Sequence, residues 1–230
     1  MPLALITGAS RGLGLALARA LAQRGWALVI DARCADDLER VARELGAITA
    51  VAAIPGDVAD PDHRSALVGA AGDTIDLLVN NASMLGPSPQ PALADYPQAE
   101  LERVYRVNVL APLALAQLAL PRIPDGGRII NVTSDAAVEP YEGWGGYGSS
   151  KAALDQLSAI LAAEQPAIAV YAVDPGDMRT RMHQEAFPGE DISDRPPPEE
   201  SVPGLLVLVQ GQLPSGRYRA KDLAAAEVPA

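Results

Sequence analysis

The sequence predicts an α/β protein whose core is one mostly parallel, seven-stranded sheet with helices on both faces. Short apolar runs alternate with longer amphipathic segments along most of the chain, and this alternation is typical of βαβ units. A length of 230 residues, 49% of them hydrophobic, suits one large domain (1–230) better than two small ones. A glycine-rich turn also follows the first apolar run, where a strand would pass into a helix.

The pattern of apolar residues places each element in order. Strands are expected at 3–7, 27–31, 48–54, 75–80, 128–133, 167–173 and, as the last of the seven, 216–220. Helices are expected between them at 12–24, 35–45, 60–71, 98–120 and 147–164.

A proline-rich, acidic segment at 187–204 interrupts this order, because three consecutive prolines and several acids rule out a regular helix there. Composition alone leaves a disordered surface loop open. The approach to the segment, however, carries Met178, Met182 and Phe187, the chain's only phenylalanine. Apolar anchors beside the crevice at the carboxyl ends of parallel strands favour a substrate lid at about 178–204.

Charge and composition exclude several classes of partner. The net charge of −11 and a pI near 4.6 argue against a nucleic-acid surface. The single cysteine cannot form an internal disulfide, and two histidines far apart in sequence make no metal cluster. The N-terminus has no positively charged leader, and the longest apolar stretches fall short of the ~20 residues of a membrane helix. A cytoplasmic protein with no membrane and no metal is expected.

The turn "TGASRGLG" has the features of a phosphate site. Gly8, Gly12 and Gly14 remove side chains where the backbone must turn tightly and approach a pyrophosphate, and the following helix offers its positive N-terminus. A tight strand-to-helix connection without a ligand is the alternative. Its place after the N-terminal strand favours the phosphate site, and with it a Rossmann-type, doubly wound fold.

The stretch "YGSSK" holds one of only two lysines in the chain. Tyr147 and Lys151 are four residues apart and share one face of a helix, where an ammonium favours the ionised form of a phenol. A tyrosine whose pKa is lowered from about 10 towards neutrality becomes a useful proton donor and acceptor. Lysine suits this position because a compact ammonium can serve a phenol and a ribose hydroxyl together.

These features together resemble the short-chain dehydrogenase/reductase family, from Leu3 to about Thr180. The motifs that carry the resemblance are, in chain order, "TGASRGLG", Asp57 in "GDV", "NNAS" at 80–83, Asn108 in "RVNVLAP", Ser134 in "NVTS", "YGSSK", and "DPGDMRT" at 174–180.

The resemblance implies roles for single residues. Ser134 would position the substrate oxygen, Tyr147 would exchange its proton, Lys151 would lower the tyrosine pKa and hold the nicotinamide ribose, and Asn108 would anchor a water relay. Asp57 would bind the adenine, and Thr180 would reach the nicotinamide carboxamide. The cofactor-binding set would be Gly8, Ser10, Arg11, Gly12, Leu13, Gly14, Arg33, Asp57, Val58, Asn81, Ala82, Tyr147, Lys151, Pro175, Gly176, Met178 and Thr180.

Taken singly, several of these residues also suit purely structural positions. Ser134 and Asn108 suit caps of regular elements, Asp57 suits a turn, and Thr180 suits a helix N-cap. The chain also departs from the family pattern twice. Ser83 stands where the family has glycine, which puts the loop conformation in question, and Asp174 stands where the family has asparagine. Neither departure is expected to touch the chemistry.

The resemblance implies an NAD(P)-dependent oxidoreductase that moves a hydride between a nicotinamide cofactor and a carbonyl or alcohol. The four-residue Tyr–Lys spacing disfavours enoyl reductases, and the length disfavours the epimerase-type branch. A dinucleotide-binding sensor or scaffold without turnover is the alternative. The substrate pocket is expected to use Ser83, Met84, Leu85, Asp135, Tyr141, Glu142, Trp144, Met178, Met182 and Phe187, although Tyr141 and Trp144 suit packing roles equally well.

The residues near the second strand bear on which cofactor is used. Asp31, about 20 residues past the glycines, would take the ribose hydroxyls of NAD. Counting from Gly8, however, the family's acidic position falls on Ala32, and Arg33 follows where phosphate-binding relatives carry arginine. With Arg11, it would grip a 2'-phosphate. NADP is therefore predicted, with NAD as the alternative.

A homodimer or homotetramer is also expected. The segments "VLAPLALAQLAL" and "AALDQLSAILAA" carry more apolar or small residues than one sheet can cover. The resemblance implies that these two helices form the shared interface.

Overall fold

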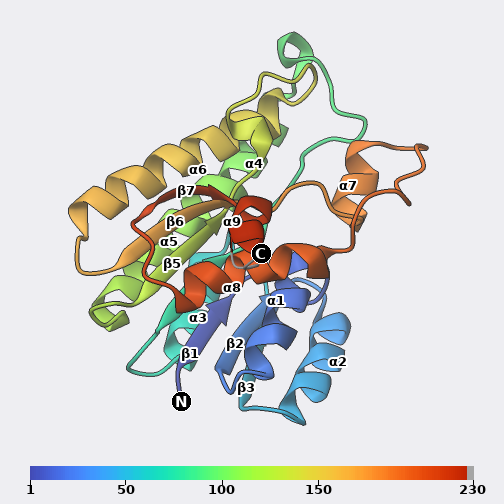
Figure 1. Cartoon of the computed structure of the whole chain (residues 1–230). Coiled ribbons are helices and arrows are strands. Elements are labelled where there is room, and N and C mark those ends of the chain that lie inside the picture. Colours follow the sequence, from blue (N-terminus) through green and yellow to red (C-terminus); the bar gives the residue numbers. More distant parts are fainter. Residues whose placement is uncertain (227–230) are drawn as a thin grey trace.

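The sheet is the centre of the computed structural model, which describes residues 1–226. Its seven strands lie in the order β3-β2-β1-β4-β5-β6-β7 and are all parallel, where a mostly parallel sheet was predicted. Figure 1 shows this arrangement. The strands are β1 Leu3–Ile6, β2 Ala27–Ala32, β3 Val51–Pro55, β4 Leu77–Asn80, β5 Arg128–Val132, β6 Ala169–Asp174 and β7 Gly216–Arg219.

The topology places a crevice at the carboxyl ends of the central strands. The chain starts at β1 in the middle of the sheet, builds outwards through β2 to β3, and then returns to pair β4 with the other side of β1. Open α/β sheets bind ligands where the strand order reverses in this way. The loops that follow β1 and β4 therefore flank the natural binding site of the fold.

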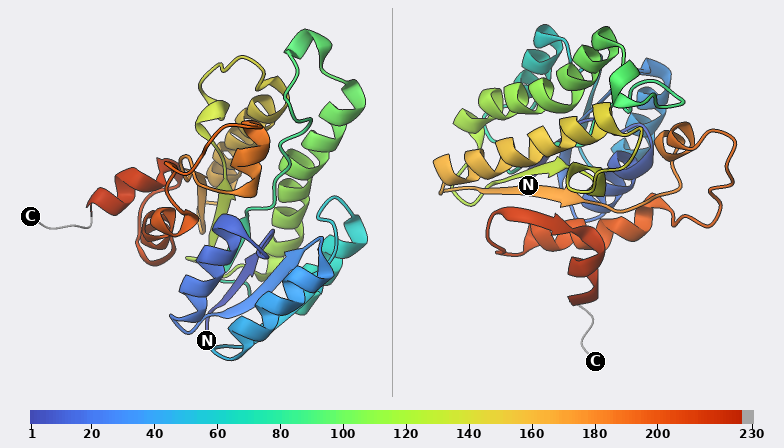
Figure 2. Two further views of the ribbon diagram at one scale, coloured as in Figure 1. Left: turned by 90° about the vertical axis from the view of Figure 1, so that its right-hand side faces the viewer. Right: turned by 90° about the horizontal axis from the view of Figure 1, so that it is seen from above.

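Helices cover both faces of the sheet, as predicted, and Figure 2 shows the two layers. One apolar core lies between the sheet and helices α1, α2, α8 and α9, and the other lies between the sheet and α3, α5 and α6. The strands are nearly continuous apolar runs because both of their faces are buried. The helices are α1 Gly12–Ala22, α2 Ala35–Gly46, α3 Pro61–Ala70, α4 Gln98–Tyr105, α5 Ala111–Ala119, α6 Gly145–Glu164, α7 Arg181–Ala186, α8 Val202–Gln210 and α9 Ala220–Ala226.

The helix predicted at 98–120 is continuous from Gln98 to Arg122, but a π-helical segment, Arg106–Leu110, separates α4 from α5. By length and composition this is the one helix in residues 1–226 that is apolar enough to cross a membrane. The helix includes the apolar stretch at 108–120, and 44% of its most apolar window is buried inside the fold. In the fold, α5 packs against α3 and β4, and the π segment packs against α6.

Several element boundaries differ from the prediction by one to three residues, and two of the differences have a clear local reason. The third strand begins at Val51 instead of 48, because Ile48 and Thr49 form the turn that closes α2 on the carbonyl of Leu45. The segment 187–204 was predicted to hold no regular helix, yet α8 begins within it. Pro203 lies in the first turn of α8, where a proline removes no helical hydrogen bond.

Candidate active site

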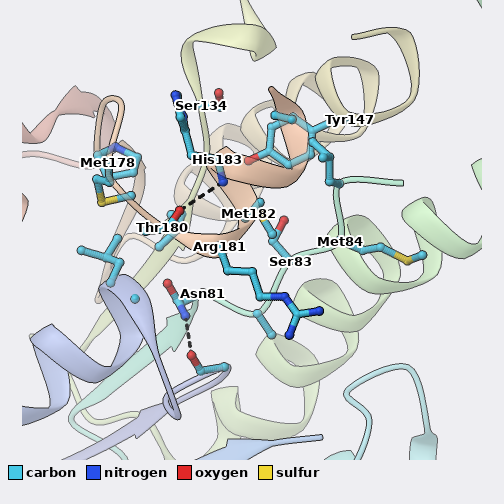
Figure 3. Close-up of a pocket in the computed structure, with 18 of the residues that line it drawn as sticks. Asn81, Ser83, Met84, Ser134, Tyr147, Met178, Thr180, Arg181, Met182 and His183 are labelled. Atoms are coloured by element: carbon cyan, nitrogen blue, oxygen red, sulfur yellow. Dashed lines mark hydrogen bonds between the residues drawn. The ribbon is translucent and has the colours of Figure 1, made fainter. Parts of the chain in front are cut away.

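A cleft of about 1020 Å³ runs along the carboxyl ends of the strands. Its walls come from the turn after β1, the ends of β2 and β3, the loops after β4, β5 and β6, and helices α6 and α7. Figure 3 shows residues from several of these segments around one opening. Every predicted site residue lines this cleft except Gly14 and Asn108, and all ten predicted substrate-pocket residues line it.

The glycine turn has the conformation that a phosphate-binding loop requires. Gly8 and Gly12 have φ of +67° and +55°, a region that side chains disfavour. Gly14 lies behind the cleft, where a Cβ would clash with the carbonyl oxygen of Gly8 and the amide of Asn81. Gly14 thus permits close packing of α1 and does not itself face a ligand. Asn81 Nδ2 donates to the carbonyl oxygens of Thr7 (2.8 Å) and Gly8 (3.1 Å), which fixes the turn from the other side.

Asp31 lines the cleft, but it is almost completely buried and its carboxylate holds the glycine turn. Its Oδ1 accepts a hydrogen bond from the Gly8 amide at 2.6 Å, and its Oδ2 lies 3.0 Å from His63 Nε2. The residue is 1% exposed. Arg11 and Arg33, by contrast, are exposed and line the cleft. Both oxygens of Asp31 thus have protein partners, whereas the two guanidiniums are exposed in the cleft.

Asp57 and Thr180 both line the cleft and both serve local structure. Asp57 Oδ1 accepts from the amide of Ala59 at 2.8 Å, as a turn former does. Thr180 Oγ1 accepts from the amide of His183 at 3.2 Å and caps α7. Asp57 is therefore a turn former and Thr180 is a helix N-cap, as their structural alternatives proposed. Both residues also line the cleft.

Tyr147 and Lys151 lie together on the buried face of α6. They are 8% and 2% exposed, and Lys151 Nζ lies 5.4 Å from the centre of the Tyr147 ring. Nζ donates to the carbonyl oxygen of Val132, the last residue of β5, at 2.8 Å. The lysine is therefore anchored at the strand end, with its charge beside the tyrosine ring.

Burial dominates the protonation of both groups. It raises the pKa of Tyr147 to about 12, a rise that the hydroxyl of Ser83 and, more weakly, that of Ser134 oppose as hydrogen-bond partners. Burial also lowers the pKa of Lys151 to about 8, against the attraction of Asp155. The pKa of Tyr147 is therefore raised in this structure, where a lowering was expected, because burial disfavours the phenolate.

Ser134 follows β5 and lies at the mouth of the cleft. Its hydroxyl donates to Asp135 Oδ1 at 3.0 Å and accepts from the amide of Ala136 at 3.2 Å, so it also caps a short 3-10 turn. Asp135 Oδ2 in turn accepts from the Tyr141 hydroxyl at 3.0 Å. A short polar chain therefore joins Ser134 to the substrate side of the cleft.

Asn108 lies behind the cleft in the π-helical segment and is completely buried. Its Oδ1 accepts from the amide of Met84 at 2.8 Å, and its Nδ2 donates to the Met84 carbonyl (2.8 Å) and to Ser150 Oγ (3.0 Å). It is not a helix cap. It joins the loop after β4 to helix α6, immediately behind Tyr147.

Ser83, the first departure from the family pattern, lines the cleft beside the groups to which the chemistry was assigned. Its hydroxyl donates to Asn108 Oδ1 at 3.2 Å, and it opposes the rise of the Tyr147 pKa. In Figure 3, Ser83 and Tyr147 border the same opening. The residue that replaces the family's glycine thus adds a hydroxyl beside the phenol.

The second departure, Asp174, stabilises the turn after β6. Its Oδ1 accepts from the amide of Gly176 at 2.9 Å, and Gly176 has φ of +78°. Burial raises the Asp174 pKa, an effect that the Gly176 amide opposes. The aspartate thus accepts a backbone hydrogen bond that an asparagine side chain could also accept.

The substrate side of the cleft is aromatic. Trp144 makes ring contacts with Tyr147 (centroids 5.8 Å apart) and Phe187 (5.9 Å), and Tyr141 packs on the far side of Trp144 at 6.3 Å. His183 stacks on Phe187 at 4.9 Å, and its buried Nε2 has no hydrogen-bond partner within residues 1–226.

Several residues that line the cleft were not named in the predicted sets, although most of those after β6 fall in the predicted lid at 178–204. They include Asp177, Arg179, Arg181, His183 and Glu185. The position of the last three directly after the family motif "DPGDMRT", in what is helix α7, was the signal that could have identified them, because α7 lines the cleft.

A parallel sheet with a glycine turn at its topological switch point, and a Tyr–Lys pair across the same cleft, defines a nucleotide-binding α/β oxidoreductase. The chain belongs to the short-chain dehydrogenase family, whose model matches residues 2–191. It is 34% identical over 199 residues to a sepiapterin reductase of Meriones unguiculatus, across 79% of this chain and 76% of the relative.

Two further comparisons are consistent with this family. The chain is 35% identical over 193 residues to a benzil reductase of Saccharomyces cerevisiae, across 79% of this chain and 73% of the relative. A short-chain dehydrogenase from Shigella flexneri, solved in complex with NADP, superimposes with a TM-score of 0.86 at 26% identity, across 96% of this chain and 97% of that one.

Proposed function

We propose that this protein is a carbonyl reductase that uses NADPH. The observation that carries the proposal is the meeting of Tyr147, Lys151 and Ser134 in the cleft that also contains the glycine turn. Two of the similar proteins described above are named as reductases, of sepiapterin and of benzil. A carbonyl substrate beside an aromatic wall is compatible with both names.

The residues of the cleft suit a dinucleotide. Gly8 and Gly12 bring bare backbone to the cleft, where it can approach a pyrophosphate, and the exposed Arg11 and Arg33 can meet a 2'-phosphate with charge-assisted hydrogen bonds. Lys151 lies where it would hold a nicotinamide ribose. When bound, the nicotinamide supplies the hydride that the protein cannot supply itself.

In the proposed mechanism, the protein binds and protonates the carbonyl oxygen. Ser134 donates a hydrogen bond to that oxygen after its hydroxyl leaves Asp135. Tyr147, protonated because burial raises its pKa to about 12, then donates its proton as the oxygen gains charge. The ammonium of Lys151 and the Ser83 hydroxyl stabilise the phenolate that remains.

The test is a panel of aryl ketones, vicinal diketones and aliphatic aldehydes, each followed by the loss of nicotinamide absorbance. NADPH-dependent turnover of at least one carbonyl class supports the proposal. A protein that binds NADPH but turns over no member of the panel would favour the sensor or scaffold alternative.

We also propose that residues 178–204 form a lid over the substrate side of a single domain, 1–230. In support, α7 lies apart from the two helical layers in Figure 1, and the segment lines the cleft through Met182, His183 and Phe187.

The choice between cofactors is tested at Arg33. Arg33→Ala should weaken NADPH affinity roughly 10-fold while NADH affinity changes little, since only the first carries a 2'-phosphate for the guanidinium to pair. Ala32→Asp should shift the preference towards NADH. Catalytic efficiency with each cofactor measures both effects, and a wild-type preference for NADH would contradict the proposal.

A further inference from the structure

A buried carboxylate–imidazole pair lies directly beneath the adenosine half of the cleft. Asp31 is near the end of β2, and His63 is in the first turn of α3; they are 1% and 8% exposed. Asp31 Oδ2 and His63 Nε2 are 3.0 Å apart. Because a carboxylate can only accept hydrogen bonds, the hydrogen between the two atoms belongs to Nε2. His63 is therefore the donor that satisfies one oxygen of a buried acid.

The same acid shapes the glycine turn. Its other oxygen accepts from the Gly8 amide at 2.6 Å, and its backbone carbonyl accepts from the Ala9 amide at 2.9 Å. Gly8 has φ of +67°, so the turn depends on partners that hold this unusual conformation. Asp31 supplies both a side-chain and a main-chain partner.

His63 also supports the loop before Asp57. Its ring packs against Gly56 so closely that a Cβ on Gly56 would clash with it. The Gly56 amide donates to the carbonyl of Ala32 at 3.0 Å. The pair thus joins three segments that line one end of the cleft: the turn at Gly8, the end of β2, and the loop of Gly56 and Asp57.

The hydrogen bonds of Asp31 bear on whether a carboxylate or a guanidinium would face the ribose of a bound cofactor. An acid at the end of the second strand normally accepts from the ribose hydroxyls of NAD and repels a 2'-phosphate. Here both carboxylate oxygens are engaged inside the protein, while Arg11 and Arg33 are exposed in the cleft. The direction of the Asp31 side chain depends on His63, because a buried carboxylate without its donor would turn towards water.

We propose that His63 is the residue that sets cofactor specificity from behind the site: by holding Asp31 against the Gly8 amide, it keeps the carboxylate out of the ribose site and leaves that site to a 2'-phosphate. The inference rests on the proposed use of a nicotinamide dinucleotide. It assigns His63 a positioning role in cofactor recognition.

Calorimetric titration with NADP⁺ and NAD⁺ tests this without a carbonyl substrate. His63→Leu removes the donor at similar volume, and the released carboxylate should weaken NADP⁺ binding roughly 10-fold. NAD⁺ binding should stay within about twofold or tighten, since the carboxylate can then accept from its ribose. The ratio of the two dissociation constants is the quantity measured.

Two matched variants separate positioning from simple loss of structure. His63→Gln keeps a nitrogen donor in reach of Asp31 and should keep the NADP⁺ preference. The double variant His63→Leu with Asp31→Ser removes the released charge and should recover the preference, a coupling that a purely structural role would not produce. Thermal unfolding checks that each variant is folded. If His63→Leu fails to fold, His63→Asn, whose shorter amide does not reach Asp31, replaces it.

The outcomes are distinguishable. A lower NADP⁺ preference in His63→Leu, preserved in His63→Gln and restored in the double variant, supports the inference. An unchanged ratio in His63→Leu, or equal weakening of both dinucleotides, overturns it while the proposed function stands. A wild-type protein that binds neither dinucleotide overturns the proposed function and this inference together.

Discussion

Tyr147 is the proton donor of the proposed mechanism, and its burial suits reduction. Burial raises its pKa to about 12, so the phenol keeps its proton at neutral pH and releases it only when a neighbouring oxygen gains charge. Lys151, whose pKa burial lowers to about 8, is still mostly protonated at about pH 7. The fold therefore supplies a protonated phenol and a nearby positive charge under the same conditions.

Tyr147→Phe should reduce turnover by at least ~100-fold, because the ring remains but the proton is lost. The dissociation constant for NADPH should stay near the wild-type value, since the phenol contributes mainly to the chemical step. Single-turnover kinetics with the substrate found in the panel, together with cofactor titration, measure both quantities. Wild-type turnover in this variant would contradict the assignment of the proton donor.

Ser83 gives a second prediction for a single side chain. Its hydroxyl opposes the rise of the Tyr147 pKa, so Ser83→Gly should raise that pKa further and move the alkaline-dependent rise of alcohol oxidation to higher pH. Reduction should slow roughly 10-fold through the lost hydrogen bond to the phenolate. The pH–rate profile of each direction is the measurement.

Ser83→Thr is the matched control, because it keeps a hydroxyl at the same position and should keep the wild-type profile. Equal profiles for Ser83→Gly and the wild type would show that the hydroxyl only supports the loop through Asn108.

Among the secondary-structure elements, the π-helical segment positions the wall behind the phenol. One wide turn at Arg106–Leu110 brings Asn108 against both backbone groups of Met84 and the hydroxyl of Ser150. Such segments commonly occur at functional sites, because the wider turn redirects one side chain out of the helical repeat. The helix thereby fixes the loop that carries Ser83.

The segment 178–204 gives a prediction for another element. Phe187 lines the cleft and contacts Trp144 and, one helical turn earlier in α7, His183. Phe187→Ala should therefore raise KM for the carbonyl substrate roughly 10-fold through lost apolar contact. The affinity for NADPH should change little. Exposed Ile48, in the turn after α2, offers a remote control as Ile48→Ala.

Trypsin provides a direct test of lid behaviour. Arg179 and Arg181 are exposed residues of this segment, and neither precedes a proline, so trypsin can cleave after both. Closure over ligands should slow cleavage there. Cleavage after these two residues that is equally fast with and without NADPH and substrate would argue against a lid.

At the scale of the whole molecule, the outer surface of helices α5 and α6 is relevant to whether copies of the chain associate. Leu118 on α5 and Ile160 on α6 are 40% and 44% exposed, and Leu110, just before α5, is 56% exposed. The two helices cover the same face of the sheet. We propose a dimer or tetramer that uses these two helices, and the exposed apolar side chains support it, since exposed apolar surface favours association.

Light scattering at micromolar concentration should therefore give the mass of a dimer or tetramer. Leu118→Glu with Ile160→Glu should shift the protein towards monomer by placing charges in the interface, and Ile48→Glu, remote from these helices, should not. A monomeric wild-type mass would refute the proposal.

Local sequence patterns were sufficient to predict the order of strands and helices, because that order follows from periods of two and 3.6 among neighbouring residues. The family resemblance assigned the glycine turn, Ser134, Tyr147 and Lys151 to one site, and all of them line one cleft at the carboxyl ends of the parallel strands. The helical start at Val202 was missed because the preceding prolines masked the pattern.

The direction in which particular side chains turn depended on packing between distant segments. Asp31 could face a ribose or the glycine turn, and the choice depends on His63, which lies 32 positions further along the chain and reaches it through the packing of α3 under β2. Ser83 contacts Asn108 for the same reason, across 25 positions. Hydrogen-bond partners are selected by long-range packing and by the cost of leaving a buried polar group unpaired, and neither is encoded in local sequence patterns.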